Sequence, residues 1–177
     1  MADTKYSMNC PACGKEMKKV FIEEAGINID IWGGAFGFVN PPPHSWHDEK
    51  YITLHPPCTY GQMLEIMADS QITLSIGVFP GGLLDRFYSG IANGSVGLTD
   101  PNTYYFKHFV DGEDSMTFDW NKLDELPGKI VNLLSDEERM QNMVNLGREK
   151  VLKNHSYSAF CKEVLNQVEI YKSVAGI

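Results

Sequence analysis

The sequence has no apolar run that approaches the roughly 20 residues needed to cross a bilayer, and its start, Met1 to Tyr6, lacks the apolar core of a signal peptide. We therefore expect a cytoplasmic protein without a transmembrane segment. Basic residues are few: 15 Lys and Arg stand against 23 Asp and Glu, which gives a net charge of −8. Because phosphate neutralisation needs a basic surface, this balance argues against a nucleic-acid partner.

Cysteine is also scarce, and four cysteines in 177 residues do not suggest a disulfide framework. A chain of this length can bury about two-thirds of its unfolded surface, so it needs neither disulfides nor a metal in order to fold. The 43% hydrophobic and 21% charged residues are typical of a globular protein. We predict one domain over residues 1–177, which includes a Pro-rich loop within residues 1–58.

Strand patterns alternate with helix patterns along most of the chain. Ile27–Trp32 alternates apolar and polar residues like a strand, and Thr59 with Gln62 forms a capping-box signature, as does Ser135 with Glu138. This order predicts an α/β fold with a Rossmann-like parallel sheet, helices on both faces and a helical C-terminus. The predicted strands span 27–32, 51–55, 71–79, 96–99 and 116–118, and the predicted helices span 15–25, 60–68, 84–92, 121–134, 135–153 and 156–172.

In an open parallel sheet, ligands bind beyond the carboxyl ends of the strands. Three loops qualify: 33–37, 79–86 and 99–102. The second is the most suggestive, because Gly81 and Gly82 let a ligand approach the backbone and the next helix directs its N–H groups at the loop. Arg86 offers a fork suited to phosphate, and Asp85 can accept hydrogen bonds from ribose or sugar hydroxyls. The alternative is a plain strand-to-helix turn, and the loop matches neither the dinucleotide fingerprint nor the P-loop.

A series of short motifs between Thr59 and His155 carries a family resemblance. These segments are Tyr60–Ser70, Asp85–Phe87, Ala92–Val96, Thr99–Asp100, Phe109–Asp114, Gly147–Val151 and Asn154–Ser156. Their order and spacing over about a hundred residues is the stronger part of the evidence. They resemble the C-terminal, nucleotide-sugar-binding half of bacterial group 1 glycosyltransferases, and most of all the spore-maturation-protein-like branch.

The resemblance implies the GT-B fold, in which two Rossmann-like domains face each other and the C-terminal one holds a nucleotide diphosphate-sugar. No metal cofactor is then required, because backbone amides and cationic side chains can stabilise the leaving diphosphate. By position, Arg86 and Asp85 would be the catalytic residues. The implied donor-binding residues are Gly33, Gly34, Thr59, Tyr60, Gly81, Gly82 and Ser89.

Two departures from the family pattern bear on the function. Many relatives carry an acidic pair in this region, but here Gly81 and Ser89 stand at the matching positions. The 177 residues also leave no room for an acceptor domain, so we expect a separate acceptor-binding domain or a homo-oligomer as partner. A non-catalytic association module of the same fold is therefore an alternative to a glycosyltransferase domain.

A second alternative rests on Cys10-Pro11-Ala12-Cys13, which has the spacing of half a zinc site. Residues 10–31 resemble the first half of a small zinc ribbon. The second cysteine pair of such a ribbon is missing, and structural zinc needs four ligands. A zinc-binding interaction domain is the function that this motif would support, and two free thiols are the plain alternative.

Overall fold

The computed structural model describes residues 8–9, 16–17, 26–32, 52–76 and 82–176. The chain divides into two compact units. Unit 1 takes residues 1–58 and 119–135, and unit 2 takes residues 59–118 and 136–177. Our expectation of one domain over the whole chain stays a prediction.

In the residues of unit 1 that the structure describes, there are two small strand pairs and one α-helix. Strands β1 (Met8–Asn9) and β2 (Glu16–Met17) pair antiparallel, whereas β3 (Ile29–Trp32) and β4 (Ile52–His55) pair parallel. The Trp32 and His55 rings stack with their centroids 3.8 Å apart. The His55 imidazole also forms a hydrogen bond with the Asp30 carboxylate, at 2.6 Å between Nε2 and Oδ1. These cross-strand contacts hold β3 and β4 in register. A 3₁₀ turn, η3 (Leu123–Glu125), leads into helix α5 (Leu126–Leu134).

Three predicted helix boundaries in the chain are wrong. Glu16 and Met17, expected in a helix over 15–25, form strand β2 and pair with β1 instead. The other residues of that predicted helix lie outside the described ones. The helix expected from residue 121 begins only at Leu126, because Pro127 is suited to a first helical turn, where no N–H partner is needed. The next helix is capped by Asp136 and not by Ser135, since the Asp136 carboxylate accepts the Arg139 N–H at 3.0 Å.

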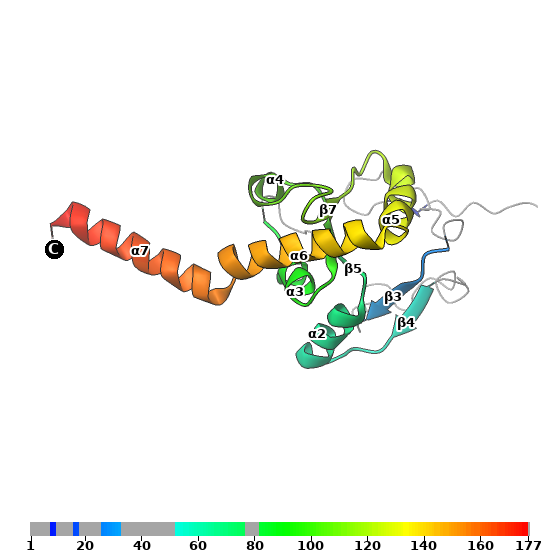
Figure 1. Cartoon of the computed structure of the whole chain (residues 1–177), viewed down its shortest axis with the longest axis horizontal. Coiled ribbons are helices and arrows are strands. Elements are labelled where there is room, and N and C mark those ends of the chain that lie inside the picture. Colours follow the sequence, from blue (N-terminus) through cyan, green and yellow to red (C-terminus); the bar gives the residue numbers. More distant parts are fainter. Residues whose placement is uncertain (1–7, 10–15, 18–25, 33–51, 77–81, 177) are drawn as a thin grey trace, which may run out of the picture. The chain divides into compact units, whose positions relative to one another are not determined.

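Unit 2 is built on a parallel sheet in the order β5-β6-β7 (Figure 1). Its strands are β5 (Ile72–Ser75), β6 (Val96–Thr99) and β7 (Met116–Thr117). The flanking helices are α2 (Tyr60–Asp69), α3 (Asp85–Ala92), α4 (Thr103–His108), α6 (Glu137–Asn154) and α7 (Tyr157–Ala175). The α/β class with a parallel sheet, flanking helices and a helical C-terminus is thus confirmed.

Unit 2 packs its helices against a buried central strand. All four residues of β6 are buried, as expected for the middle strand of the sheet. Helix α3 packs on β5 and β6, and α6 packs on α3. Gly97 of β6 allows this approach, because a Cβ there would lie 2.7 Å from the Ile91 side chain of α3. The core is formed by Phe87, Ile91, Tyr105, Phe109 and Val151.

The end of α6 is held by an aromatic cluster around His155. Its backbone N–H donates to the Val151 carbonyl at 2.8 Å, and its ring stacks on Phe109 with centroids 5.4 Å apart. Tyr88 of α3 and His108 of α4 lie at 5.1 and 5.2 Å from the same ring. Burial lowers the pKa of His155, and the neighbouring His108 and Lys150 lower it further.

This environment predicts a pH-dependent stability. The pKa of His155 is lower in the folded than in the unfolded chain. The stability that the neutral His155 ring contributes is therefore fully present above the unfolded-state pKa and is lost as the pH falls toward the folded-state pKa. We expect His155→Phe, which keeps a ring in the cluster, to lose less stability than the wild type between pH 7.5 and pH 5. Urea midpoints at both pH values measure this, and equal losses in the two proteins would contradict it.

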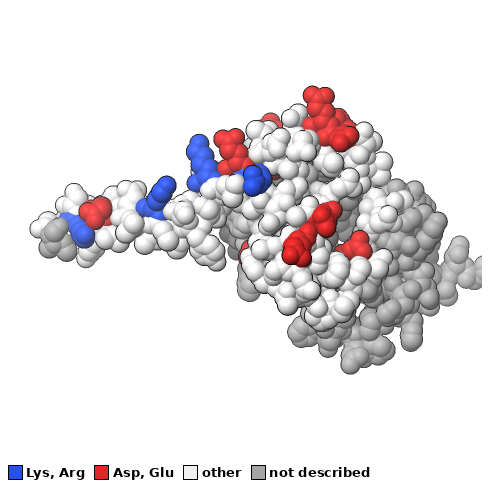
Figure 2. Space-filling view, turned by 60° about the horizontal axis from the view of Figure 1, so that its bottom comes forward, with Lys and Arg blue, Asp and Glu red and all other residues white. Residues whose placement is uncertain are grey.

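Helix α7 follows α6 after His155 and begins at Ser156, whose hydroxyl accepts the Ala159 N–H at 3.2 Å. The predicted helix over 156–172 is confirmed and extends to Ala175. Most of its surface in Figure 2 is uncharged, and it exposes Phe160, Leu165 and Tyr171. Across the described parts of the chain, we find no helix with the length and apolar character to span a membrane.

Candidate functional site

The carboxyl edge of the unit 2 sheet ends in three hydroxyl residues in register. Ser75, Thr99 and Thr117 are the last residues of β5, β6 and β7, with Ser75 opposite Thr99 and Thr99 opposite Thr117. All three are buried. The Thr117 hydroxyl donates to the Thr99 carbonyl at 2.9 Å, and the Thr99 hydroxyl donates to the Asp100 carboxylate at 3.4 Å. This edge is where a parallel sheet positions ligand-binding groups.

Helix α3 begins beside this edge. Its N-cap, Leu84, supplies no capping side chain. The Arg86 N–H donates instead to the Asp85 carboxylate at 2.9 Å. Both side chains belong to exposed residues, so the Arg86 guanidinium is accessible at the positive end of the helix dipole.

Asn102 joins two of the loops selected from the sequence. Its side-chain amide donates to the Gly82 carbonyl at 3.3 Å, while its side-chain oxygen accepts the Tyr105 N–H at 2.8 Å. The same residue therefore caps α4 and ties the loop after β6 to the loop before α3. Helix α4 is not among the helices predicted from the sequence, and this cap stabilises its first turn.

The other predicted donor-binding residues of unit 2 lie on α2 and α3. Thr59 is the N-cap of α2, and the predicted capping box with Gln62 is present. Tyr60, the first residue of α2, is 63% exposed, so its ring is accessible. Ser89 is half-buried on α3, where its backbone carbonyl accepts the Asn93 side-chain amide at 2.7 Å. Helices α2 and α3 are in contact, which brings the two groups of residues into one unit.

Several predicted residues cannot be placed. Gly33, Gly34 and Gly81 lie outside the described residues, as do Cys10 and Cys13 of the suggested half zinc site. Within the described ranges, no group of three or more His, Cys, Asp or Glu side chains could hold a metal ion. The described residues therefore give zinc no support.

Ser75 is not among the candidate residues that the sequence indicates. Its signal was weak, since a Ser inside the predicted strand 71–79 looks like any polar strand residue. The structure ends β5 at Ser75 and buries this residue to 4% exposure, which places it directly before the strand-to-helix loop. Asn102 lay at the end of a selected loop, but its link to Gly82 requires tertiary structure.

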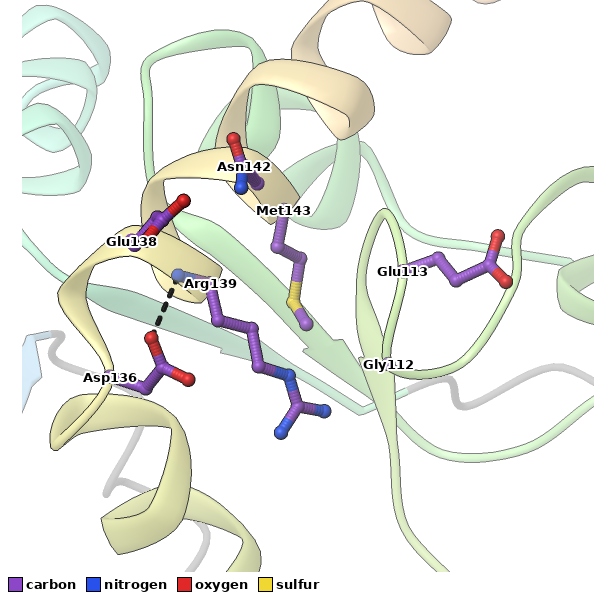
Figure 3. Close-up of a pocket in the computed structure, with 7 residues that line it drawn as sticks. All are labelled: Gly112, Glu113, Asp136, Glu138, Arg139, Asn142 and Met143. Carbon is purple, nitrogen blue, oxygen red and sulfur yellow. Dashed lines mark hydrogen bonds between the residues drawn. The ribbon is translucent and has the colours of Figure 1, made fainter.

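An open pocket of about 270 Å³ lies elsewhere, between the first turns of α6 and the turn that enters β7 (Figure 3). Arg139 and Met143 point from α6 toward the turn that holds Gly112. Asp136 caps α6 through the Arg139 N–H, so this helix start is already occupied. The pocket does not include the loops at the carboxyl ends of the strands, and we do not assign the donor site to it. Its full lining is Gly112, Glu113, Asp136, Glu138, Arg139, Asn142 and Met143.

Solved structures share this fold at low sequence identity. Anabaena Alr3699/HepE, solved in complex with UDP and glucose, has a TM-score of 0.68 and 10% identity. That match covers 85% of this chain and 44% of the HepE chain. TarM gives a TM-score of 0.61 at 14% identity over 82% of this chain and 31% of its own. A glycosyltransferase from Rickettsia africae gives 0.66 at 14% identity, covering 88% and 44%.

This chain thus spans less than half the length of each of these structures, and the likeness shows the fold. No curated protein matches it by sequence. Residues 15–166, however, match the family described as glycosyl transferase-like, which includes β2 to β7 and α2 to α6. Because that match covers most of the chain, and the fold agrees with GT-B glycosyltransferases, the chain belongs to the glycosyl transferase-like family.

Proposed function

We propose that unit 2 binds the nucleotide diphosphate-sugar donor of a glycosyl transfer at the carboxyl edge of β5, β6 and β7. The observation that carries this proposal is the start of α3 at that edge, with an exposed Arg86 and no capping side chain from Leu84. Family membership supports it. So does the fold shared with HepE, which has been solved with UDP-glucose.

The diphosphate would lie against the first turn of α3. Backbone N–H groups there and the helix dipole favour an anion. The Asp85 carboxylate opposes it, since it is a negative charge in the same turn. The Arg86 guanidinium must outweigh this repulsion, and charge-assisted hydrogen bonds to phosphate make it suited to do so. In the same role it would stabilise the charge that develops on the leaving diphosphate.

The sugar and ribose would be held by the groups around this turn. We assign hydroxyl recognition to Asp85 and Ser89 on α3, and contacts with the base to Thr59 and Tyr60 at the start of α2. Gly82 would supply backbone contact, because Asn102 fixes its carbonyl. Transfer itself would also need an acceptor site, supplied by a separate domain or a second copy. We propose a cytoplasmic location for this reaction.

The test is nucleotide binding by the wild type and Arg86→Ala, with Arg139→Ala as the matched control. Arg139 is also exposed near a helix start, but on α6 beside Gly112. We expect the wild type to bind one of UDP, GDP or ADP in isothermal titration calorimetry. Loss of the Arg86 interaction should weaken that binding by about 2 kcal/mol, in the range of charged hydrogen bonds, while Arg139→Ala should bind as the wild type does.

Two results would count against this function. If none of the three nucleotides binds, the chain is a member of the family that does not bind such donors, and the association module is favoured. If both arginine variants lose affinity equally, the site does not lie at α3. If Arg86→Ala binds the nucleotide as the wild type does and changes only the unfolding midpoint, Arg86 affects stability and not donor binding.

A further inference from the structure

Ser75 has a buried hydroxyl that finds no partner among the residues that the structure describes. The residue is 4% exposed, and within those residues its Oγ makes no hydrogen bond. The other two hydroxyl residues at this edge of the sheet have partners: the Thr99 hydroxyl donates to the Asp100 carboxylate, and the Thr117 hydroxyl donates to the Thr99 carbonyl. A buried hydroxyl without a partner destabilises the folded state, so its presence at the carboxyl end of β5 needs an explanation.

The side chain of Ser75 is on the face of β5 that supports α3. Thr73, two residues earlier, lies against α3, because a Cβ on Gly90 would be 2.8 Å from the Thr73 Cβ. Alternate residues of a strand point to the same side, so Ser75 points toward α3 as Thr73 does. The next strand agrees, since Gly97, opposite Thr73, lies beneath Phe87 and Ile91 of α3.

The direction of α3 brings its first turn close to Ser75. Gly90, near the end of the helix, contacts Thr73 in the middle of β5, and Phe87 contacts Gly97 in the middle of β6. Since α3 connects two parallel strands, it runs back against their direction. Its first residues, Asp85 and Arg86, therefore lie toward the carboxyl ends of the strands, where Ser75 and Thr99 stand.

We propose that the Ser75 hydroxyl is a donor-binding group, which donates a hydrogen bond to a phosphate oxygen of a nucleotide diphosphate at the first turn of α3. This assignment rests on the function proposed above and adds a residue to it. It accounts for the missing partner, because the ligand provides the acceptor that the fold omits. It also places a neutral donor below the helix start, where Arg86 provides the charge.

Ser75→Ala tests this inference, with Ser95→Ala as the matched control. Ser95 is a fully buried serine next to β6, and its hydroxyl pairs with that of Thr73 at 2.6 Å. We expect Ser75→Ala to bind UDP, GDP or ADP and inorganic pyrophosphate about tenfold more weakly, with a urea midpoint equal to or above that of the wild type. Ser95→Ala should do the reverse, with a lower midpoint because Thr73 loses its partner, and unchanged affinity.

The outcomes separate this inference from the proposed function. If the wild type binds a nucleotide and Ser75→Ala binds it equally well, the role of Ser75 is wrong and the proposed function stands. If pyrophosphate binds in a Ser75-dependent way but no nucleotide binds better than pyrophosphate, Ser75 contacts phosphate and the nucleotide-sugar function is wrong. If the wild type binds neither class, both fail. A lower unfolding midpoint for Ser75→Ala with full affinity would show that its hydroxyl is structural.

Discussion

Replacing Phe87 by Ala should lower the unfolding free energy of unit 2 by about 4 kcal/mol. The Phe87 side chain is fully buried, and its ring meets those of Phe109 and Tyr105 edge-on at 5.1 and 6.2 Å. It also covers Gly97 of the central strand. Truncation therefore leaves a cavity between α3, α4 and β6, where no single side chain can refill the space.

Urea unfolding followed by far-UV circular dichroism measures this change, because unit 2 holds α2, α3, α4, α6 and α7. Tryptophan fluorescence reports on unit 1 instead, since Trp32, Trp46 and Trp120 all belong to it. Phe106→Ala is the matched control, because Phe106 is 62% exposed on α4 and should change stability by less than about 1 kcal/mol. Equal losses of unfolding free energy in the two variants would contradict the placement of Phe87 in the core.

Gly147→Ala should destabilise unit 2 by about 3 kcal/mol, although Ala favours helices over Gly. A Cβ at Gly147 would lie 2.3 Å from the Asp114 carbonyl oxygen and 3.2 Å from the Ile91 side chain. The first of these is backbone and cannot rotate away. Helix α6 would have to move off the turn before β7, and so off the Lys150–Asp114 ion pair that fastens it there.

Gly61→Ala provides the comparison, since Gly61 is also a helical glycine of unit 2 but has nothing within 4 Å of its Cβ position. We expect that change to be neutral or stabilising by up to about 1 kcal/mol. The urea midpoint should therefore fall for Gly147→Ala and stay unchanged or rise for Gly61→Ala. If Gly147→Ala is as stable as the wild type, α6 does not approach Asp114 as closely as described here.

Local signals in the sequence predicted several elements well. The Thr59–Gln62 capping box starts α2, Ser156 starts α7, and the apolar segment 96–99 coincides with β6. Such signals succeed because a cap or a short apolar segment acts within a few residues. They failed where two local solutions compete, as at Ser135 and Asp136, since either side chain could cap α6 and only Asp136 does.

The candidate site divides in the same way. Asp85 and Arg86 are candidates from the sequence alone, because a glycine-containing loop before a predicted helix predicts an anion site; their role there stays a prediction. Ser75 and the Asn102–Gly82 hydrogen bond could not be predicted from the sequence, since both depend on which strands are neighbours and where each ends. The spacing of residues in a sequence does not indicate which buried hydroxyl lacks a hydrogen-bond partner. The buried, unpartnered Ser75 hydroxyl is visible only once the sheet is packed.

The sequence by itself determined the α/β class, the starts of α2 and α7, and the family to which the chain belongs, because caps, periodicity and motif order are short-range properties. Only the tertiary structure decided that the strands pair in the order β5-β6-β7, that Gly97 and Gly147 are points of close approach, and that Ser75 and Thr99 lie side by side near α3. Those features arise from contacts between residues distant along the chain, which are selected by close packing of the whole core rather than by local preference.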